Sequence, residues 1–345
     1  MNPPTMCKRC VLVESKPDIW LDERGICNLC LDFEKGKSSQ QGNSKLLETD
    51  LIRTLNKYKG NGQYDCLVMC SGGKDSTSTL YYMVKKYRMR PLAFTFEHGF
   101  APEEAVKNIK NAVDTLKVDW LFFKSDFMQD FFAEIIKTKA KVPICPPCSI
   151  WYMQLVHDVA KRYNIPLIIA GWTRGQFTRQ EILTNDTGGS PPEPEFVSLA
   201  AATSDFIDRI RKKYPKYKDF PKTVNEVKKK YKGIMALSPH WFLQKDAREY
   251  TELIKRELHW EPIPISYPAG STNCYLNNLG AYLSIKHYGF NHYHIEMSNL
   301  IRLGEISREE ALKALEIDID KEPMSSVISS VLNKLGCHGC HLVDS

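Results

Sequence analysis

The residues whose types and order best suit chemistry form one short stretch, 71–77, with the sequence Ser-Gly-Gly-Lys-Asp-Ser-Thr. It follows an apolar run, 64–69, that predicts a buried strand, and it leads into a segment, 77–86, with apolar residues at helical spacing. Glycines let the backbone approach an anion, and a helix N-terminus offers free N–H groups and a favourable dipole. The stretch therefore predicts a phosphate-binding turn; the alternative is an ordinary surface turn.

The spacing of this stretch matches neither the Walker A pattern nor GxGxxG. Ser-Gly-Gly-x-Asp-Ser resembles the PP-loop of ATP pyrophosphatases, which activate a substrate oxygen with AMP and release pyrophosphate. Lys74 would add positive charge there, and Asp75 would either hold Mg²⁺ for the leaving pyrophosphate or cap the helix. The residues expected to bind the phosphates of ATP are Ser71, Gly72, Gly73, Lys74, Asp75, Ser76 and Thr77.

Two segments at the ends of other predicted strands would complete an ATP site. Phe96, within 94–98, is expected to frame the adenine. Gly171 is expected near the α-phosphate together with Arg174, whose guanidinium would stabilise the adenylating transition state. For Arg174 the alternative is a surface ion pair.

The cysteines form a second group of candidate functional residues. No run of about 18 apolar residues is present, and residues 1–10 lack the apolar core of a signal peptide. We therefore expect a cytoplasmic protein without a membrane span, where paired cysteines indicate metal or redox chemistry instead of disulfides. Eight of the eleven cysteines form four CxxC pairs, Cys7/Cys10, Cys27/Cys30, Cys145/Cys148 and Cys337/Cys340.

The first two pairs have the spacing of a zinc ribbon, because sixteen residues separate Cys10 from Cys27. Four thiolates, from Cys7, Cys10, Cys27 and Cys30, complete a closed tetrahedral site, so Zn²⁺ there would be structural. The alternative is four unrelated reduced thiols. A small hairpin is expected between the pairs, turning at 23–25.

The third pair, Cys145 and Cys148, precedes a predicted helix whose dipole would favour their thiolates. With Cys274 they offer three thiolates, which suit a metal or an iron–sulfur cluster that keeps one open position. The alternatives are a redox pair and two inert thiols. In the tail, 337–341, two thiols and two imidazoles could bind zinc jointly with another segment, or the tail is disordered.

Strands and helices alternate along the middle of the chain, which predicts an α/β fold with a parallel, doubly wound sheet and ligands at the carboxyl ends of its strands. The expected strands are 64–69, 91–97, 119–123 and 166–171, and the expected helices are 103–116, 127–138 and 151–163. We divide the chain into a zinc ribbon (1–35), a linker and helix (36–62), a PP-loop domain (63–205) and a mostly helical C-terminal region (206–345).

The charge and the remaining segments constrain the partners less. The net charge of +6 permits an anionic substrate but does not require nucleic acid. Basic and aromatic residues alternate in 206–232, which suits a nucleic-acid backbone; the alternative is a solvated helical face. Ser307 and Glu310 form a capping box for a helix at 311–315. A long loop is expected at 178–196, and helices are expected at 246–258, 278–288 and 296–303.

Motifs along most of the chain resemble the N-acetyl sugar amidotransferases of surface-polysaccharide and flagellin-sugar biosynthesis. These motifs are 7–11, 17–19, 22–30, the PP-loop and 300–311. The resemblance implies that ATP adenylates the acetamido oxygen of a nucleotide-linked sugar and that ammonia replaces this oxygen. It also implies glutaminase and ammonia-channel partner proteins and a role in lipopolysaccharide biosynthesis; we further expect a homodimer.

A smaller set of residues resembles the tRNA two-thiolation enzymes. In that family a CxxC pair and one later cysteine bind a [4Fe-4S] cluster, as Cys145, Cys148 and Cys274 would here, and zinc sites lie at both chain ends. Lys74 in the loop also fits this family better. Both families form an adenylated intermediate and pyrophosphate, and they differ in the nucleophile, ammonia or sulfide. The expected function is an amidotransferase, with an iron–sulfur sulfurtransferase acting on a tRNA base or a small metabolite as the alternative.

Overall fold

The central feature of the fold is a parallel sheet whose strands end at a common edge. The computed structural model describes residues 5–36, 48–176, 196–243, 245–271, 273–318 and 321–338. Five strands pair in the order β3-β2-β1-β4-β5, and all neighbours are parallel. The strands are β1 (Cys66–Met69), β2 (Pro91–Glu97), β3 (Asp119–Lys124), β4 (Leu167–Ile169) and β5 (Met235–Leu237).

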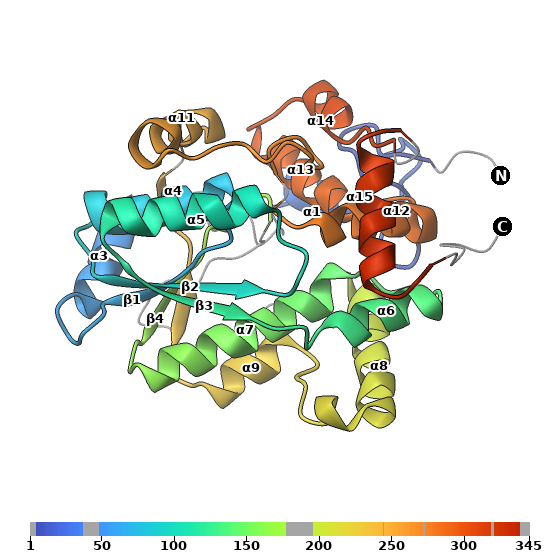
Figure 1. Ribbon diagram of the computed structural model, residues 1–345. Helices are drawn as coiled ribbons and strands as arrows, with labels where there is room; N and C mark the ends of the chain where they lie inside the picture. Colours follow the sequence, from blue (N-terminus) through green and yellow to red (C-terminus); the bar gives the residue numbers. More distant parts are fainter. Residues whose placement is uncertain are drawn as a thin grey trace.

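Helices cover both faces of this sheet (Figure 1). Successive residues of β1 point to opposite faces, so Val68 joins one buried cluster and Leu67 the other. The first cluster includes side chains of α3 (Glu48–Tyr58), α4 (Lys74–Tyr81), α5 (Glu103–Leu116) and α11 (Ala247–Leu258). The second includes side chains of α6 (Gln129–Lys137), α7 (Cys145–Arg162), α8 (Val197–Lys213) and α9 (Val224–Lys230).

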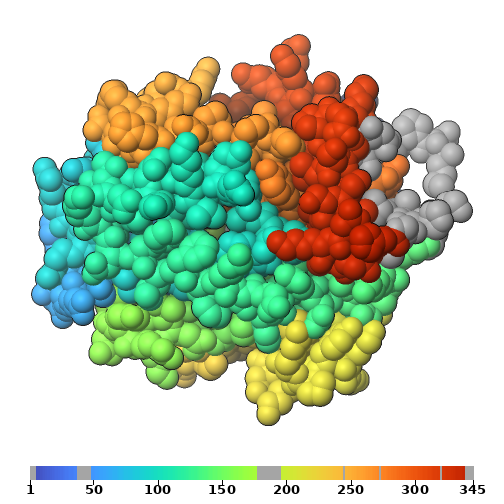
Figure 2. All heavy atoms as spheres, viewed as in Figure 1, coloured from blue at the N-terminus to red at the C-terminus, as the bar shows by residue number. Residues whose placement is uncertain are grey.

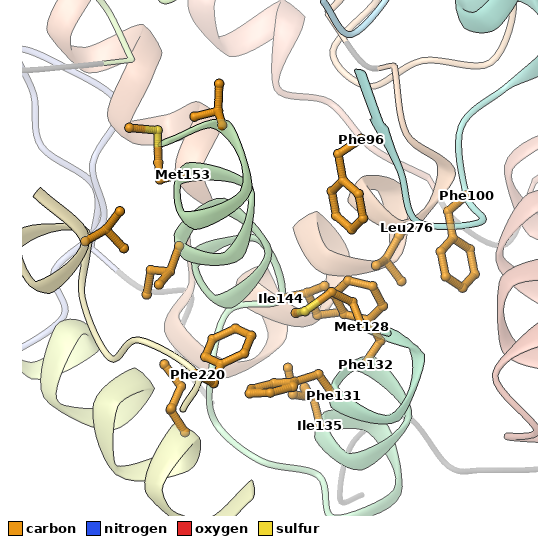
Figure 3. Close-up of a cluster of buried hydrophobic side chains, with 14 of the residues drawn as sticks. Phe96, Phe100, Met128, Phe131, Phe132, Ile135, Ile144, Met153, Phe220 and Leu276 are labelled. Atoms are coloured by element: carbon orange, nitrogen blue, oxygen red, sulfur yellow. The ribbon is translucent and has the colours of Figure 1, made fainter. Parts of the chain in front are cut away.

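The C-terminal helices lie beyond the carboxyl ends of the strands (Figure 1). Leu276 joins the larger core cluster and lies among Phe96, Phe100 and Phe132 (Figure 3). In the space-filling view the orange and red C-terminal segments pack directly against the teal segments (Figure 2). These helices are α12 (Tyr275–Tyr288), α13 (His292–Leu303), α14 (Arg308–Ala314) and α15 (Met324–Lys334); the short helices are α1 (Asn28–Glu34) in the ribbon and α10 (His240–Leu243).

Predictions of elements were accurate where the apolar pattern was long. β2 and α5 have the predicted bounds, and the capping box of α14 is present. α7 begins at Cys145 instead of 151, because Pro146 and Pro147 are tolerated in a first helical turn, where N–H groups need no partner. Of the loop predicted at 178–196, all but Phe196 lies outside the described residues.

We missed β5 and α10, which have only three and four residues, and also α8 and α15; the apolar spacing of α15 was present in the sequence and was overlooked. The sheet therefore continues past residue 205, which itself lies inside α8. The division of the chain into domains stays a prediction. Among the described residues, no helix is long and apolar enough to cross a membrane.

The aromatic residues of the basic segment 206–232 are part of the core. Tyr217, Phe220 and Tyr231 are buried in the larger cluster, where Phe220 stacks on Trp151 with ring centroids 5.4 Å apart. These three rings are therefore not available to stack on bases, whereas most of the basic side chains of this segment are exposed. A nucleic-acid partner stays a prediction, and the buried aromatic residues no longer support it.

One prediction concerns the two glycines of the loop after β1. Gly72 has φ +79°, and a Cβ there would lie 2.1 Å from the carbonyl oxygen of Ala105, whereas a Cβ on Gly73 would meet only Asn273, at 3.7 Å. We expect Gly72→Ala to lower the free energy of unfolding by about 2–5 kcal/mol through strain and overpacking. Gly73→Ala is the matched control and should cost about 1 kcal/mol, as a poorer N-cap. Urea denaturation followed by circular dichroism measures both; equal losses would contradict the close-approach argument.

Candidate active site at the carboxyl edge of the sheet

The PP-loop is a tight turn, and side chains from other parts of the chain donate hydrogen bonds to one of its carbonyl groups. Gly72 O accepts hydrogen bonds from Trp260 Nε1 at 2.9 Å and from Asn108 Nδ2 at 3.3 Å. Gly73 is the N-cap of α4, so the first-turn N–H groups of this helix have no intrahelical partner. The turn therefore presents a helix N-terminus at the edge of the sheet, as the sequence predicted, and this arrangement favours an anion.

A second backbone segment approaches the same helix end. A Cβ on Gly171, just after β4, would lie 2.6 Å from Ser76 N, so only glycine fits there. Ser71 N–H donates to Ser76 Oγ at 3.2 Å, and the two hydroxyl groups lie 3.0 Å apart. Thr77 is buried. The structure thus brings together the predicted residues of the loop and of the β4 end.

Lys74 and Asp75 form an ion pair at the start of α4, with Nζ 3.2 Å from Oδ2. Tyr250 donates its hydroxyl hydrogen bond to Asp75 Oδ1, and His240 Nε2 donates to Asp75 O at 2.9 Å. Burial alone would raise the pKa of Asp75, but Lys74, His240 and the Tyr250 hydroxyl outweigh burial and hold that pKa below its usual value. The helix-cap alternative for Asp75 is wrong, because Gly73 is the N-cap. A charged Asp75 fits Mg²⁺, an oxygen-seeking cation.

Arg174 is placed near the site but is engaged by protein groups. Its Nε and Nη2 atoms donate to Trp241 O at 3.3 and 3.0 Å, and Nη1 lies 3.5 Å from Glu305 Oε1. Only 11% of its side chain is exposed, so this is not a surface ion pair of the ordinary kind. Its predicted role at the α-phosphate stays a prediction.

Phe96, expected to frame the adenine, lies at the end of β2 and is 9% exposed. Its ring stacks on Phe123, with centroids 6.1 Å apart, and contacts Tyr152 (Figure 3 shows its position). Phe96 therefore stabilises the carboxyl edge of the sheet by packing against these rings. Its contact with adenine stays a prediction.

Sequence reasoning missed Glu296, a carboxyl group on α13 that reaches this edge. Thr173 Oγ1 donates to Glu296 Oε1 at 3.3 Å. Burial raises the pKa of Glu296 to about 7; the Asp75 charge adds to this rise, whereas Lys74 and hydrogen bonds from Gln176 and Thr173 oppose it. The sequence signal that could have indicated it is a single acidic residue in the predicted helix, which is otherwise mostly apolar or uncharged. Only the fold shows that this glutamate faces the PP-loop.

The raised pKa of Glu296 makes stability depend on pH. Because the folded protein holds this proton more tightly than an unfolded chain, the contribution is complete below the usual glutamate pKa and is lost as the pH rises through about 7. We expect Glu296→Gln to be more stable than the parent at pH 8, by on the order of 1–3 kcal/mol, and to lose this advantage near pH 5. Thermal unfolding from pH 5 to 8 measures the effect, with Glu309→Gln on the exposed face of α14 as control. An advantage that did not change with pH would contradict it.

Cys145 and Cys148 lie in the first turn of α7, and Cys274 is the N-cap residue of α12. Cys274 Sγ lies 3.6 Å from His98 Nε2, and Cys145 Sγ lies 3.6 Å from Asn277 Oδ1. Contrary to our expectation of thiolates, burial raises the pKa of Cys145 to about 12 and of Cys274 to about 11, and that of Cys148 well above its usual value. A metal or cluster would therefore have to displace these protons.

The trio is nevertheless close enough for charge on Cys274 to raise the pKa of both other thiols. In the part of the chain that the structure describes, it does not belong to a set of ligands within 4.8 Å of one another. Beside Cys145 opens a cavity of about 590 Å³, whose walls include Ile150, Thr203, Tyr288 and Gln176.

The N-terminal ribbon has the geometry of a closed metal site. The four sulfur atoms of Cys7, Cys10, Cys27 and Cys30 lie within 4.8 Å of one another and are buried. Backbone N–H groups of Arg9, Cys10 and Cys27 donate to Cys7 Sγ at 3.3–3.5 Å. Four sulfur donors around one point fit a tetrahedral zinc ion. Cys337 is buried, whereas Cys340 lies outside the described residues, so the predicted tail site stays a prediction.

The sheet, the PP-loop at its carboxyl edge and the four-cysteine ribbon define the class of the fold. It is an α/β fold with a parallel sheet covered by helices on both faces, as the sequence predicted, with an N-terminal four-cysteine ribbon. Residues 269–341 match the family model of the C-terminal domain of WbpG-like lipopolysaccharide biosynthesis proteins.

The full chain is similar to the uncharacterized protein MJ1599 of Methanocaldococcus jannaschii, with 25% identity over 311 residues, 90% of this chain and 92% of that protein. It is also similar to the U34-tRNA thiolase NcsA of Methanococcus maripaludis with its [4Fe-4S] cluster, at 14% identity and a TM-score of 0.35, covering 92% of this chain and 91% of that one. The NH3-dependent NAD synthetase of Campylobacter jejuni matches at 14% identity and a TM-score of 0.32, covering 66% of this chain and 99% of that one.

Proposed function

We propose that this protein is an ATP-dependent amidotransferase that adenylates the acetamido oxygen of a nucleotide-linked N-acetyl sugar and replaces it by ammonia. The observation that carries the adenylation step is the double close approach at α4. Gly72, just before the N-cap of α4, lies against the backbone of Ala105, and Gly171 lies against the backbone of Ser76 in the first turn of α4. Lys74 adds a positive charge in the same turn. Such a cradle suits the phosphates of ATP.

The first half-reaction would proceed at this edge. The acetamido oxygen attacks the α-phosphorus, the bond to the bridging oxygen breaks, and pyrophosphate leaves. The α4 N-terminus and Lys74 would stabilise the charge of the leaving group, and Asp75, kept ionised by its neighbours, would hold Mg²⁺. When bound, Mg²⁺ supplies further neutralisation of that charge.

In the second half-reaction, ammonia attacks the activated carbon. One proton leaves the nitrogen, the carbon–oxygen bond breaks, and AMP departs with the former acetamido oxygen. Glu296 is the candidate acceptor of this proton, because its carboxyl group has a pKa of about 7 and lies on the charged side of the loop. Gln176, a hydrogen-bond partner of Glu296, also lines the cavity beside Cys145, which offers a path for the second substrate.

The choice of a sugar substrate is supported by the match of residues 269–341 to WbpG-like lipopolysaccharide biosynthesis proteins. The described part of this region contains α12 to α15, which lie beyond the carboxyl ends of the strands (Figure 1). A substrate bound over the PP-loop would therefore meet these helices. Glutaminase and ammonia-channel partners, a homodimer and a cytoplasmic location belong to the same proposal.

Loss of the loop charges tests the adenylation step. With ATP, Mg²⁺, ammonium chloride and UDP-N-acetylhexosamines as probes, we expect release of AMP and pyrophosphate. Lys74→Ala and Asp75→Asn should each lower the rate by about 10²–10³-fold, because each removes a preorganised charge near the reacting phosphates. Lys85→Ala, an exposed lysine beyond α4, is the control and should keep the parent rate. Unchanged release in Lys74→Ala would refute the assignment of the loop.

A second candidate function is an iron–sulfur-dependent sulfurtransferase acting on a tRNA base or a small metabolite, with sulfide as the nucleophile. The cysteine trio favours it. Cys145, Cys148 and Cys274 are close enough for the charge of Cys274 to raise the pKa of the other two thiols. Among the described residues the three sulfur atoms are nevertheless not within 4.8 Å of one another, as the ligands of one ion would be. A cluster is larger than one ion and is held by cysteine thiolates.

Metal analysis of anaerobically purified protein tests this candidate. It predicts a brown protein with iron, labile sulfide and absorbance near about 400 nm. Cys145→Ser should remove the iron and the colour, whereas Cys66→Ala, in the core strand β1, should keep both. A colourless, iron-free parent protein would eliminate the sulfurtransferase candidate and leave the amidotransferase.

A further inference from the structure

A buried arginine lies between the ribbon and the active-site edge. Arg302 of α13 is 7% exposed, and its Nη1 donates to Cys30 Sγ at 3.9 Å. Its Nη2 donates to Asn299 Oδ1, one turn earlier on the same helix. The guanidinium therefore bridges a predicted metal ligand and a buried amide.

The same amide continues the contact toward the PP-loop. Asn299 is 1% exposed, and its Nδ2 donates to Gly175 O at 2.7 Å. Gly175 and Gly171 flank the short segment after β4, and Gly171 contacts the backbone of Ser76 in α4. An unbroken series of contacts thus runs from Cys30 through Arg302 and Asn299 to the phosphate-binding helix end.

The charge of Arg302 needs an anionic partner. Within the described ranges its side-chain hydrogen bonds go to a sulfur atom and an amide oxygen, although a buried guanidinium is stable only when its charge is compensated. Four thiolates around Zn²⁺ carry a net negative charge, which Arg302 would balance from the second coordination sphere. Without the ion, the thiols lose their negative charge when they are protonated, and Arg302 loses this anionic partner.

The ribbon also forms hydrogen bonds with neighbouring residues of the C-terminal region. Arg308 Nε donates to Cys10 O at 3.0 Å and its Nη2 to Cys7 O at 3.4 Å. Val11 N–H donates to Ser298 Oγ at 3.3 Å. Both metal-binding turns of the ribbon, near Cys7 and near Cys30, are therefore attached to the region that carries Asn299.

We propose that Arg302 and Asn299 couple the ribbon metal to the PP-loop, so that zinc and MgATP each strengthen the binding of the other. Arg302 is a positioning residue: it ties α13 to the metal-bound sulfur, and Asn299 transmits that position to the segment after β4. The inference rests on the proposed ATP binding. Thermodynamic linkage requires the two effects to be equal, and a coupling of about 5- to 150-fold is typical.

The test measures zinc affinity by competition with the chelator 4-(2-pyridylazo)resorcinol, on zinc-loaded full-length protein with and without saturating MgATP. Calorimetry gives the Kd of MgATP for the zinc-loaded and zinc-depleted forms. In the parent protein we expect MgATP to raise zinc affinity at least about 5-fold, and zinc to lower the Kd of MgATP by the same factor. If zinc depletion unfolds the chain, MgATP raises zinc affinity through folding alone, and the variant at Asn299 then decides whether the path exists.

Four variants separate the links. Arg302→Met should lower zinc affinity by about 10–100-fold, as loss of an outer-shell partner does, and Arg302→Lys should restore part of it. Asn299→Leu, an uncharged side chain of similar size, makes neither hydrogen bond, so it should abolish the effect of MgATP on zinc affinity. Arg256→Met, at the exposed end of α11, is the control and should keep both.

Each outcome decides between the two proposals. If MgATP binds and zinc affinity is unchanged by it, the coupling is refuted and the adenylating function stands. If MgATP does not bind the zinc-loaded protein at all, both are refuted. If Asn299→Leu retains the full coupling, the path through Asn299 is wrong.

Discussion

The close approach of two backbone segments around one helix N-terminus is the constraint on which the site depends. Gly72 and Gly171 leave no room for a side chain beside Ala105 and Ser76. Neighbouring backbone can therefore pack closely around the first turn of α4. The free N–H groups of this turn supply partial positive charge. The parallel sheet makes this possible, since it delivers the ends of β1 and β4 to the same edge as neighbours.

Helices of the C-terminal region complete this edge. α12 contributes Leu276 to the same core cluster as Phe96, and α13 brings Glu296 toward Lys74 and Asp75. Because α13 also carries Arg302, one helix contacts both the phosphate loop region and the metal ribbon. Packing of this kind explains how a small ribbon can matter for a site that contains none of its residues.

Burial decides the chemistry of several groups in opposite ways. It raises the pKa of Glu296 to a value useful for proton transfer near neutrality, whereas Asp75 stays ionised because three partners compensate its burial. It keeps the thiols of Cys145 and Cys274 protonated in spite of nearby helix N-termini. On an exposed edge a glutamate would instead keep its usual pKa and would be ionised near neutrality.

The sequence by itself determined the local features: the PP-loop, the ribbon spacing, and the bounds of β2 and α5, because each depends on residues close together in the chain. Only the tertiary structure decided the rest. It buried Tyr217 and Phe220 in the core, made Gly73 the cap of α4, and added β5 to the sheet. It also placed Glu296 and Arg302 beside partners that are distant in the sequence, and such long-range contacts leave no periodic signal. The type of loop is thus a local property, whereas the charge and protonation of the groups around it depend on what the whole fold buries.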